Sequence, residues 1–215
     1  MSKTLRIVIT GPPASGKGTQ GETMSKDYNL PIIGSGDILR AEARSGSEIG
    51  KKIAEVMAAG QLVSDELIIP AVISQLEARK DGGWILDGFP RSESQAHFLC
   101  NEIKKGATSV MPTHLLVLDA ADEVVVERMG GRRIDPETKK VYHMKYLPPP
   151  PEIIPRLIIR DDDQEDKIKE RLKIYHEATD KWIAIFEKEL GLKPIHVNSV
   201  QEIDKVYEDI KKALL

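Results

Sequence analysis

A glycine-rich stretch near the start of the chain has the residue types and spacing of a phosphate-binding loop. It reads Gly-Pro-Pro-Ala-Ser-Gly-Lys-Gly-Thr over residues 11–19, between a strand-like apolar run at 5–10 and a helical pattern at 16–28. The glycines would let backbone N–H groups surround phosphate oxygens, while the helix N-terminus adds partial positive charge. Lys17 would reach toward the β- and γ-phosphates of a nucleotide. A glycine-rich turn without a ligand is the simpler interpretation, but strand, glycines, lysine and helix occurring together favour a phosphate site.

A carboxylate and an arginine follow the apolar run Trp-Ile-Leu-Asp at 84–87. Because the carboxyl ends of parallel strands meet at one edge of a sheet, Asp87 would lie near the phosphate loop and hold Mg²⁺ through bound water. Strands often end in Asp at a turn, so Asp87 alone is a weak indication. Arg91 would stand at the same edge, where its planar guanidinium suits phosphate oxygens.

Further arginines gather in the second half of the chain: Arg128, Arg132, Arg133, Arg160 and Arg171. Arg128 and Arg132 are four residues apart in a helical pattern at 121–133, so we expect them on one helix face. Any single arginine is explained about as well by a solvated surface charge. Phosphoryl transfer needs several cations around the transferring group, and the set as a whole therefore favours such a site.

The elements that would position these residues alternate between strands and helices, which favours an α/β fold with a parallel sheet and helices on both faces. Ligands bind such sheets at the carboxyl ends of the strands. Ser64 is a candidate N-cap. Residues 34–63 and 131–163 do not fit the alternation, and we interpret them as insertions into one domain spanning 1–215. The expected strands are 5–10, 31–33, 84–87, 114–119 and 194–197, and the expected helices are 16–28, 38–45, 47–59, 64–80, 92–105, 121–133 and 201–214.

Composition excludes several classes of protein. The 215 residues suffice for one sizeable core, and a net charge of -3 provides no general field for nucleic acid. We expect no membrane partner, because no apolar run approaches the roughly 20 residues of a spanning helix. The single cysteine, Cys100, forms neither an internal disulfide nor a four-ligand zinc site, which favours a reducing compartment. We expect a cytoplasmic protein, while an organelle whose presequence has been removed stays open.

Seven motifs, in order, resemble those of the adenylate kinases of the long-lid type, which are P-loop nucleoside monophosphate kinases. They are GPPASGKGTQ, GSGDILRAE, GQLVSDEL, ILDGFPRS, ERMGGRRIDP, VYHMKY and RDDDQEDKIKERL, and they cover nearly the whole chain. The resemblance implies a core of five parallel strands, an AMP-binding helical insertion at 34–63 and a lid at 131–163. It also implies the reaction ATP + AMP ⇌ 2 ADP with Mg²⁺, and a monomer.

The resemblance assigns roles to individual residues of this sequence. On the ATP side it implies Ala14, Ser15, Gly16, Lys17, Gly18, Thr19, Arg132, Val141, Tyr142 and Gln201. On the AMP side it implies Ser35, Arg40, Gln61, Leu62, Val63, Gly88, Phe89, Pro90, Arg91, Gln95, Arg160 and Arg171, with Gln95 reading the adenine edge. The catalytic cations would be Lys17, Arg91, Arg128, Arg132, Arg160 and Arg171, and the Mg²⁺ site would use Thr19 and Asp87.

The chain departs from the family pattern at a few positions. Ser35 stands where Thr is common, which keeps the hydroxyl, and Gln201 stands where a Lys often lies against adenine. The lid has no cysteine, so we expect no structural zinc; Asp135, Thr138 and His143 could form a polar network instead.

Two rival nucleotide pairs are a GTP donor and a pyrimidine acceptor, although pyrimidine kinases usually have a short lid. A GTPase switch would need an N-K-x-D motif, which the sequence lacks. A catalytically silent protein would have no reason to keep every cation.

The mechanism implied by these residues is positioning and charge stabilisation, without a covalent nucleophile or a strong base. Water is the competing acceptor, so a closing lid would exclude it, with hinges at Gly130-Gly131 and Asp161–Asp163. The glycine pair could equally serve to end a helix. We expect lid opening to limit turnover.

Overall fold

The computed structural model describes residues 4–79, 82–106 and 110–214. Its main sheet has five parallel strands in the order β2-β3-β1-β4-β7, which confirms the predicted α/β fold. Central strand β1 pairs in register with β3 on one side and β4 on the other, so the loop after Thr10 leaves from the middle of the sheet edge. The strands are β1 (Arg6–Thr10), β2 (Ile32–Gly34), β3 (Trp84–Asp87), β4 (His114–Asp119) and β7 (Pro194–Asn198).

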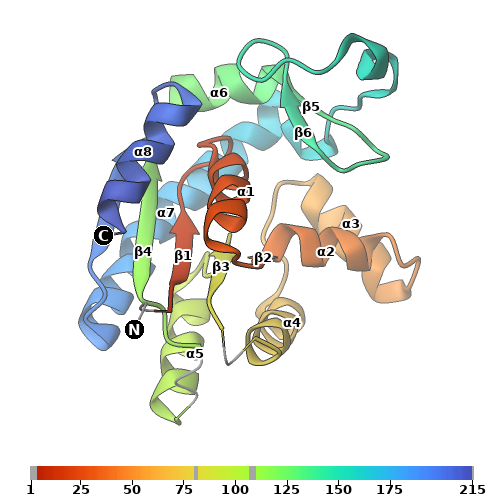
Figure 1. Cartoon of the computed structure of the whole chain (residues 1–215). Coiled ribbons are helices and arrows are strands. Elements are labelled where there is room, and N and C mark those ends of the chain that lie inside the picture. The colour runs from red at the N-terminus through yellow and green to blue at the C-terminus, as the bar shows by residue number, and fades with distance from the viewer. Residues whose placement is uncertain (1–3, 80–81, 107–109, 215) are drawn as a thin grey trace.

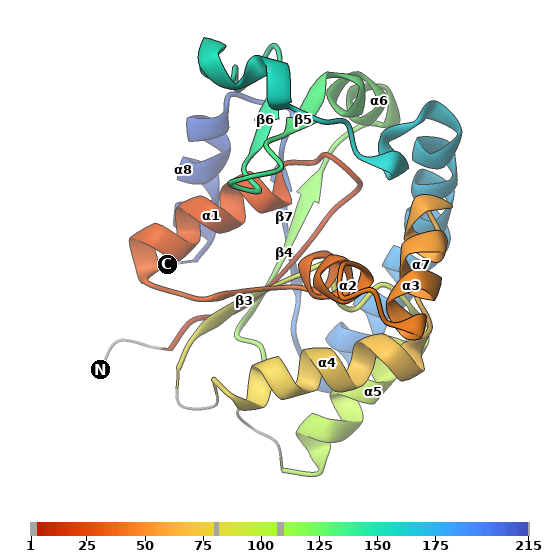
Figure 2. The same ribbon diagram turned by 90° about the vertical axis from the view of Figure 1, so that its right-hand side faces the viewer.

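Helices cover both faces of this sheet (Figures 1 and 2). Because side chains alternate across a strand, Ile7 and Ile9 of β1 face one layer while Val8 faces the other. The layer on the Ile7 side contains α1 (Lys17–Tyr28) and α8 (Ile203–Ala213). The layer on the Val8 side contains α4 (Asp65–Glu77), α5 (Glu93–Lys104) and α7 (Glu165–Leu190).

Two segments lie outside this core and flank the carboxyl ends of its strands (Figure 1). The first contains α2 (Ser35–Ala43) and α3 (Glu48–Ala58). The second follows α6 (Asp122–Gly131) and begins with the antiparallel pair β5 (Arg132–Ile134) and β6 (Val141–His143). It continues through the 3₁₀ turns η2 (Pro151–Arg156) and η3 (Asp161–Asp163). These segments fall within the ranges 34–63 and 131–163, whose status as insertions with separate roles stays a prediction.

The structure corrects several expected elements. Helix α6 ends at Gly131, and Arg132 is extended with φ -70° and ψ 137°, so Arg128 and Arg132 do not share a helix face. Helix α2 begins at Ser35, three residues before the expected start at 38.

Helix α7 is the largest element that the sequence reasoning missed. It runs over 26 residues, none of which falls in an expected element. Its buried positions include Ile168, Leu172, Ile183 and Phe186, a helical spacing interrupted by the polar stretch around residues 175–180.

The Ser64 N-cap is confirmed by position, since α4 begins at Asp65, although the Ser64 side chain makes no capping hydrogen bond. Its carbonyl accepts the N–H groups of Leu67 and Ile68 instead. Lys80, the expected end of that helix, lies outside the described residues.

Candidate active site

A cavity of about 700 Å³ opens at the carboxyl ends of the strands, between the α2–α3 segment and the β5–β6 segment. Residues from both segments and from the core line it. Among them are all the residues that the resemblance assigns to the two nucleotides, together with Asp87 and the six cations, whereas Pro12, Arg133, Asp135 and Thr138 are not. The predicted nucleotide-binding residues therefore share one cavity.

The phosphate loop takes its shape from unusual backbone angles. Gly11, Ala14 and Gly16 have φ values of +149°, +55° and +93°, so the chain turns sharply before entering α1. A side chain at position 11 would approach the Leu118 carbonyl oxygen to 2.5 Å, which leaves room only for glycine. Ala14 holds a left-handed conformation that is costly for a residue with a Cβ atom. The loop thus accepts local strain while it places the first N–H groups of α1 at the cavity.

Lys17 and Asp87 face each other in the buried floor of the site. The Lys17 ammonium donates to the carbonyl oxygens of Gly11 and Pro12, both at 2.8 Å. Burial lowers the pKa of Lys17 to about 8, although the Asp87 carboxylate opposes this shift. Burial also raises the pKa of Asp87, against the attraction of Lys17 and Arg91. Lys17 and Asp87 are half-buried, so their charges interact more strongly than they would at an open surface.

The turn after β3 brings Ser35 and Arg91 onto one carbonyl group. The Ser35 hydroxyl donates to the Gly88 oxygen at 2.6 Å, and Nε of Arg91 donates to the same oxygen at 2.7 Å. Gly88 has φ +75°, and a Cβ atom there would lie 2.6 Å from the Arg91 guanidinium. Glycine at 88 thus allows Arg91 to fold over the turn.

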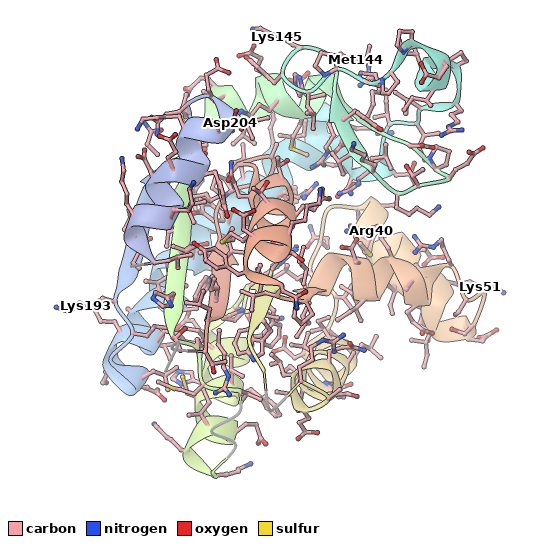
Figure 3. The ribbon with its side chains drawn as sticks, in the orientation of Figure 1. Arg40, Lys51, Met144, Lys145, Lys193 and Asp204 are labelled. Atoms are coloured by element: carbon pink, nitrogen blue, oxygen red, sulfur yellow. The ribbon has the colours of Figure 1, made fainter. Side chains whose placement is uncertain are left out.

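Arg40 belongs to the opposite wall of the cavity. Figure 3 shows it on the side of α2 that faces the β5–β6 segment. Its guanidinium pairs with Asp37, one turn earlier in α2, at 2.7 Å. This i,i+3 pair is largely exposed and contributes little to stability.

Two of the predicted catalytic arginines are paired with carboxylates of η3. Arg132 makes a two-pronged contact with Asp163, in which Nε lies 2.8 Å from Oδ2. The Asp163 side chain is only 1% exposed, so this ion pair is buried. Arg171 of α7 contacts Asp162 at 2.6 Å, and burial lowers the pKa of Arg171 to about 10. The proposed hinge run therefore supplies counter-charges to two predicted catalytic cations.

The remaining arginines contact no carboxylate among the described hydrogen bonds. Arg128 donates to the Ser199 carbonyl at 2.7 Å and the Ala14 carbonyl at 3.4 Å, which links the phosphate loop to the segment after β7. The Nε atom of Arg160 is buried and has no hydrogen-bond partner within the described part of the chain. Burial lowers the pKa of Arg160 to about 10, with Arg132 and Arg40 adding repulsion.

Two predicted glutamines are held by contacts at the cavity rim. Gln61 donates to Glu170 of α7 at 2.7 Å, and Gln201 donates to the Asn198 carbonyl at 2.8 Å. Both side chains line the cavity while making these contacts.

The predicted polar lid network is only partly correct. Asp135 accepts from Thr138 at 2.8 Å and from Arg156 at 2.6 Å, and these bonds help lower its pKa to about 2. His143 is not part of this network, because its Nδ1 accepts the backbone N–H groups of Lys145 and Tyr146. Its ring also lies against Gly131, where a Cβ atom would approach Nε2 to 2.4 Å. Arg156, on η2, takes the place that the sequence suggested for His143.

Sequence reasoning missed one wall of the cavity, which belongs to α7. Ile174, Tyr175, Thr179 and Trp182 line it, at the same helical spacing that begins with Arg171. Positions 171, 175, 179 and 182 recur every three or four residues, so the sequence did contain a signal for this face.

The oxygen ligands suit the expected metal. A hydroxyl from Thr19 and the Asp87 carboxylate both line the cavity, and hard oxygen donors are what Mg²⁺ prefers. Among the described residues, there is no cluster of three or more His, Cys, Asp or Glu side chains arranged to hold a metal ion. The same described ranges contain no helix that is long and apolar enough to span a bilayer.

The fold and this cavity define a P-loop phosphotransferase with two flanking segments. A sequence model of the family "Adenylate kinase" matches residues 9–190. The chain belongs to the adenylate kinase family, nucleoside monophosphate kinases that convert ATP and AMP into two ADP.

Named relatives match over nearly the whole chain. The chain is 42% identical to "Probable adenylate kinase 2, chloroplastic" of Oryza sativa subsp. japonica, covering 98% of this chain and 70% of the relative. It is 41% identical to "Adenylate kinase, chloroplastic" of Zea mays, and the match covers 100% of this chain and 93% of the relative. It is 38% identical to "Adenylate kinase" of Giardia intestinalis, and the match covers 97% of this chain and 81% of the relative.

Proposed function

We propose that the cavity holds ATP over the phosphate loop and AMP against α2 and the turn after β3, with the six cations around the transferring group. The observation that carries this proposal is the convergence of all the predicted donor, acceptor and cationic residues on one cavity. The donor side comprises residues 14–19 with Arg132, Val141, Tyr142 and Gln201. The acceptor side comprises Ser35, Arg40, residues 61–63 and 88–91, and Gln95.

The reaction needs no protein nucleophile. An anionic phosphate oxygen of AMP attacks the γ-phosphorus of ATP, the bond from that phosphorus to the β,γ-bridging oxygen breaks, and ADP leaves. Charge accumulates on the transferring group, and preorganised cations in a buried site stabilise it. Lys17 and Arg91 are well suited to this work, because their hydrogen bonds to loop carbonyls fix them at the floor.

Magnesium would be held by Thr19 and Asp87, through water. When bound, it would neutralise charge on the β- and γ-phosphates. In this arrangement the Asp87 charge favours the protonated form of Lys17 and so opposes the larger effect of burial, which lowers the pKa of Lys17 to about 8.

The segment 131–163 is proposed to act as a lid that keeps water from the transferring phosphoryl group. The pairing of Arg132 with Asp163 supports a hinge at η3, because the lid edge and the start of α7 are joined there. Gly130 and Gly131 end α6 and can serve the hinge as well.

Compartment and assembly remain predictions. The free, buried Cys100 supports a reducing compartment such as the cytoplasm, whereas two of the relatives are named as chloroplastic. The expected monomer can be checked by light scattering of the purified protein.

The role of Arg91 tests the proposal directly. Arg91→Ala removes a fixed cation from the floor, so kcat should fall by roughly 100-fold or more while the fold is retained. Arg79→Ala is the matched control, because Arg79 is not among the residues that line the cavity and its guanidinium donates to the carbonyl and side chain of Gln75, one turn earlier. Steady-state rates and thermal melts of both variants would be measured. A near-normal kcat in Arg91→Ala would remove Arg91 from the mechanism.

A further inference from the structure

The side-chain amide of Gln95 is held at both ends by the protein. Gln95 lies in the first turn of α5 and is only 4% exposed. Its Oε1 accepts the backbone N–H of Arg91 at 2.8 Å. Its Nε2 donates to Oδ1 of Asp65 at 2.8 Å.

These two contacts permit only one orientation of the amide. A primary amide has an acceptor oxygen on one side and a donor nitrogen on the other. Rotating it by half a turn would place Nε2 against the Arg91 N–H and Oε1 against the Asp65 carboxylate. One donor would then face another donor, and one acceptor would face another acceptor, which is unfavourable in a buried place.

The contact with Asp65 has no role in capping the helix. Ser92 is the N-cap of α5, and its hydroxyl accepts the Gln95 backbone N–H at 3.2 Å. The contact from Gln95 Oε1 to the Arg91 N–H resembles the returning bond of a capping box. Asp65 belongs to α4, and its other oxygen accepts the Ser94 hydroxyl at 2.5 Å. Its hydrogen bond to Gln95 therefore needs another explanation.

The hydrogen-bonding pattern of purine bases provides that explanation. Adenine presents a 6-amino donor beside the N1 acceptor, whereas a 6-oxopurine presents an oxygen acceptor beside an N1–H donor. Gln95 retains one more lone pair and one more N–H for a ligand. One orientation of the amide complements adenine, and the flipped orientation complements the 6-oxopurine.

We propose that Asp65 is a specificity-determining positioning residue for the acceptor site. Its carboxylate fixes the Gln95 amide in the orientation that pairs with adenine and resists the flip that would admit a 6-oxopurine nucleotide. The inference rests on the proposed role of Gln95 in reading the acceptor base. Discrimination of this kind is strong when a site must leave a buried polar group unpaired to accept the wrong base.

The test compares AMP with inosine monophosphate, whose base differs in the 6-substituent and the N1 proton. Asp65→Asn is isosteric but can offer either a donor or an acceptor to Gln95, and Asp65→Ala offers neither. In both variants the ratio of kcat/KM for AMP to that for inosine monophosphate should fall by about 10-fold. The KM for AMP should rise while the KM for ATP stays constant. A merely structural defect would change the KM values of both substrates and lower the melting temperature.

Two further variants identify the cause. Ser94→Ala removes the partner of Asp65 Oδ2 but leaves the contact with Gln95, so the ratio should change by less than about twofold. Gln95→Ala removes the amide, so the ratio should collapse. If both Asp65 variants keep the wild-type ratio while Gln95→Ala lowers it, the inference is overturned and the acceptor-site assignment stands. If Gln95→Ala also keeps the ratio, the assignment of Gln95 fails and the inference fails with it.

Discussion

Two groups of cations line the same cavity, and they differ in what holds them. Arg132 and Arg171, beside η3, are paired with the carboxylates of Asp163 and Asp162. Lys17 and Arg91, at the floor, donate to backbone carbonyl oxygens. Phosphate oxygens must displace a carboxylate from a hydrogen bond in the first group, but only a carbonyl oxygen in the second.

This difference suggests two roles for the cations, one of holding a fixed charge and one of exchanging partners when a ligand binds. Cations held by carbonyls keep their place and their net positive charge, so they suit the stabilisation of a developing anion. Cations paired with hinge carboxylates can exchange those partners for phosphate, which would couple ligand binding to movement of the lid. Arg160 is intermediate between the two groups. The charges of Asp162 and Asp163 attract it, but its buried Nε has no hydrogen-bond partner among the described residues.

A large loss of activity, comparable with that of Arg91→Ala, is expected for Arg160, which makes no carboxylate hydrogen bond among the described contacts. Arg160→Ala should lower kcat by roughly 100-fold, because a buried cation near the transferring group is lost. Its unfolding free energy should stay unchanged or rise, since the variant removes a buried nitrogen without a partner. Steady-state kinetics and urea unfolding would check both parts. Loss of stability without loss of activity would place Arg160 in the other group.

For Arg132, substitution should mainly lower the unfolding free energy, in contrast to Arg160. Arg132→Ala leaves the buried Asp163 carboxylate with only the longer contact to Arg171, at 3.8 Å, so the unfolding free energy should fall by about 2–4 kcal/mol. The double variant Arg132→Ala with Asp163→Ala should recover part of this loss, because the poorly compensated charge is removed as well. Urea unfolding of the two single variants and the double variant measures the coupling. Additive losses would show that the pair does not stabilise the hinge.

The pH dependence of kcat/KM tests the charge state of Lys17 at the floor of the site. The pKa of Lys17 is about 8, below its ordinary value of 10.5, so the free enzyme loses this charge above pH 8. Since kcat/KM reports the free enzyme, its value for ATP should fall about tenfold per pH unit above pH 8. The kcat at saturating ATP should fall later, because bound phosphates raise the pKa of Lys17.

The lowered pKa of Lys17 affects stability in the opposite direction from kcat/KM as the pH rises. Between pH 8 and 10.5 the unfolded chain binds more protons at Lys17 than the folded chain does, so this contribution to stability rises with pH. A fall in kcat/KM caused by unfolding would therefore appear as a loss of thermal stability, which separates the two explanations. A flat profile from pH 7 to 9.5 would contradict the low pKa of Lys17.

The smallest expected effect concerns the lid. If opening of the segment 131–163 limits turnover, kcat should fall about twofold when a small viscogen doubles the relative viscosity. A polymeric viscogen, which raises the bulk viscosity without slowing local motion, serves as the control. A kcat that ignores the small viscogen would show that the chemical step limits the rate.

The parts of the molecule with local signals could be predicted from the sequence. The phosphate loop at 11–19 and the five strands carry patterns of adjacent residues, and the sheet confirms those strands. Arg132 was expected on a helix because a spacing of four suits one, yet the chain becomes extended directly after the glycine pair.

The carboxylate partners of these side chains could not be predicted from the sequence. Asp163 pairs with a residue 31 positions away, and Asp65 with one 30 positions away. Such pairs depend on how elements pack, which no local spacing reveals. Helix α7, by contrast, did carry a helical pattern, and the interrupted apolar face explains why it was missed.

The most direct test of the proposed donor and acceptor sites is a coupled assay in which ATP with magnesium is offered AMP, GMP, UMP and CMP in turn, and then GTP replaces ATP as donor. Turnover should be rapid with ATP and AMP, with two ADP formed for each ATP consumed, and much slower with every other acceptor. Turnover with another acceptor but not with AMP would contradict the acceptor site built around Ser35, Arg40 and Gln95. A lack of turnover with all pairs would contradict the catalytic role of the cations.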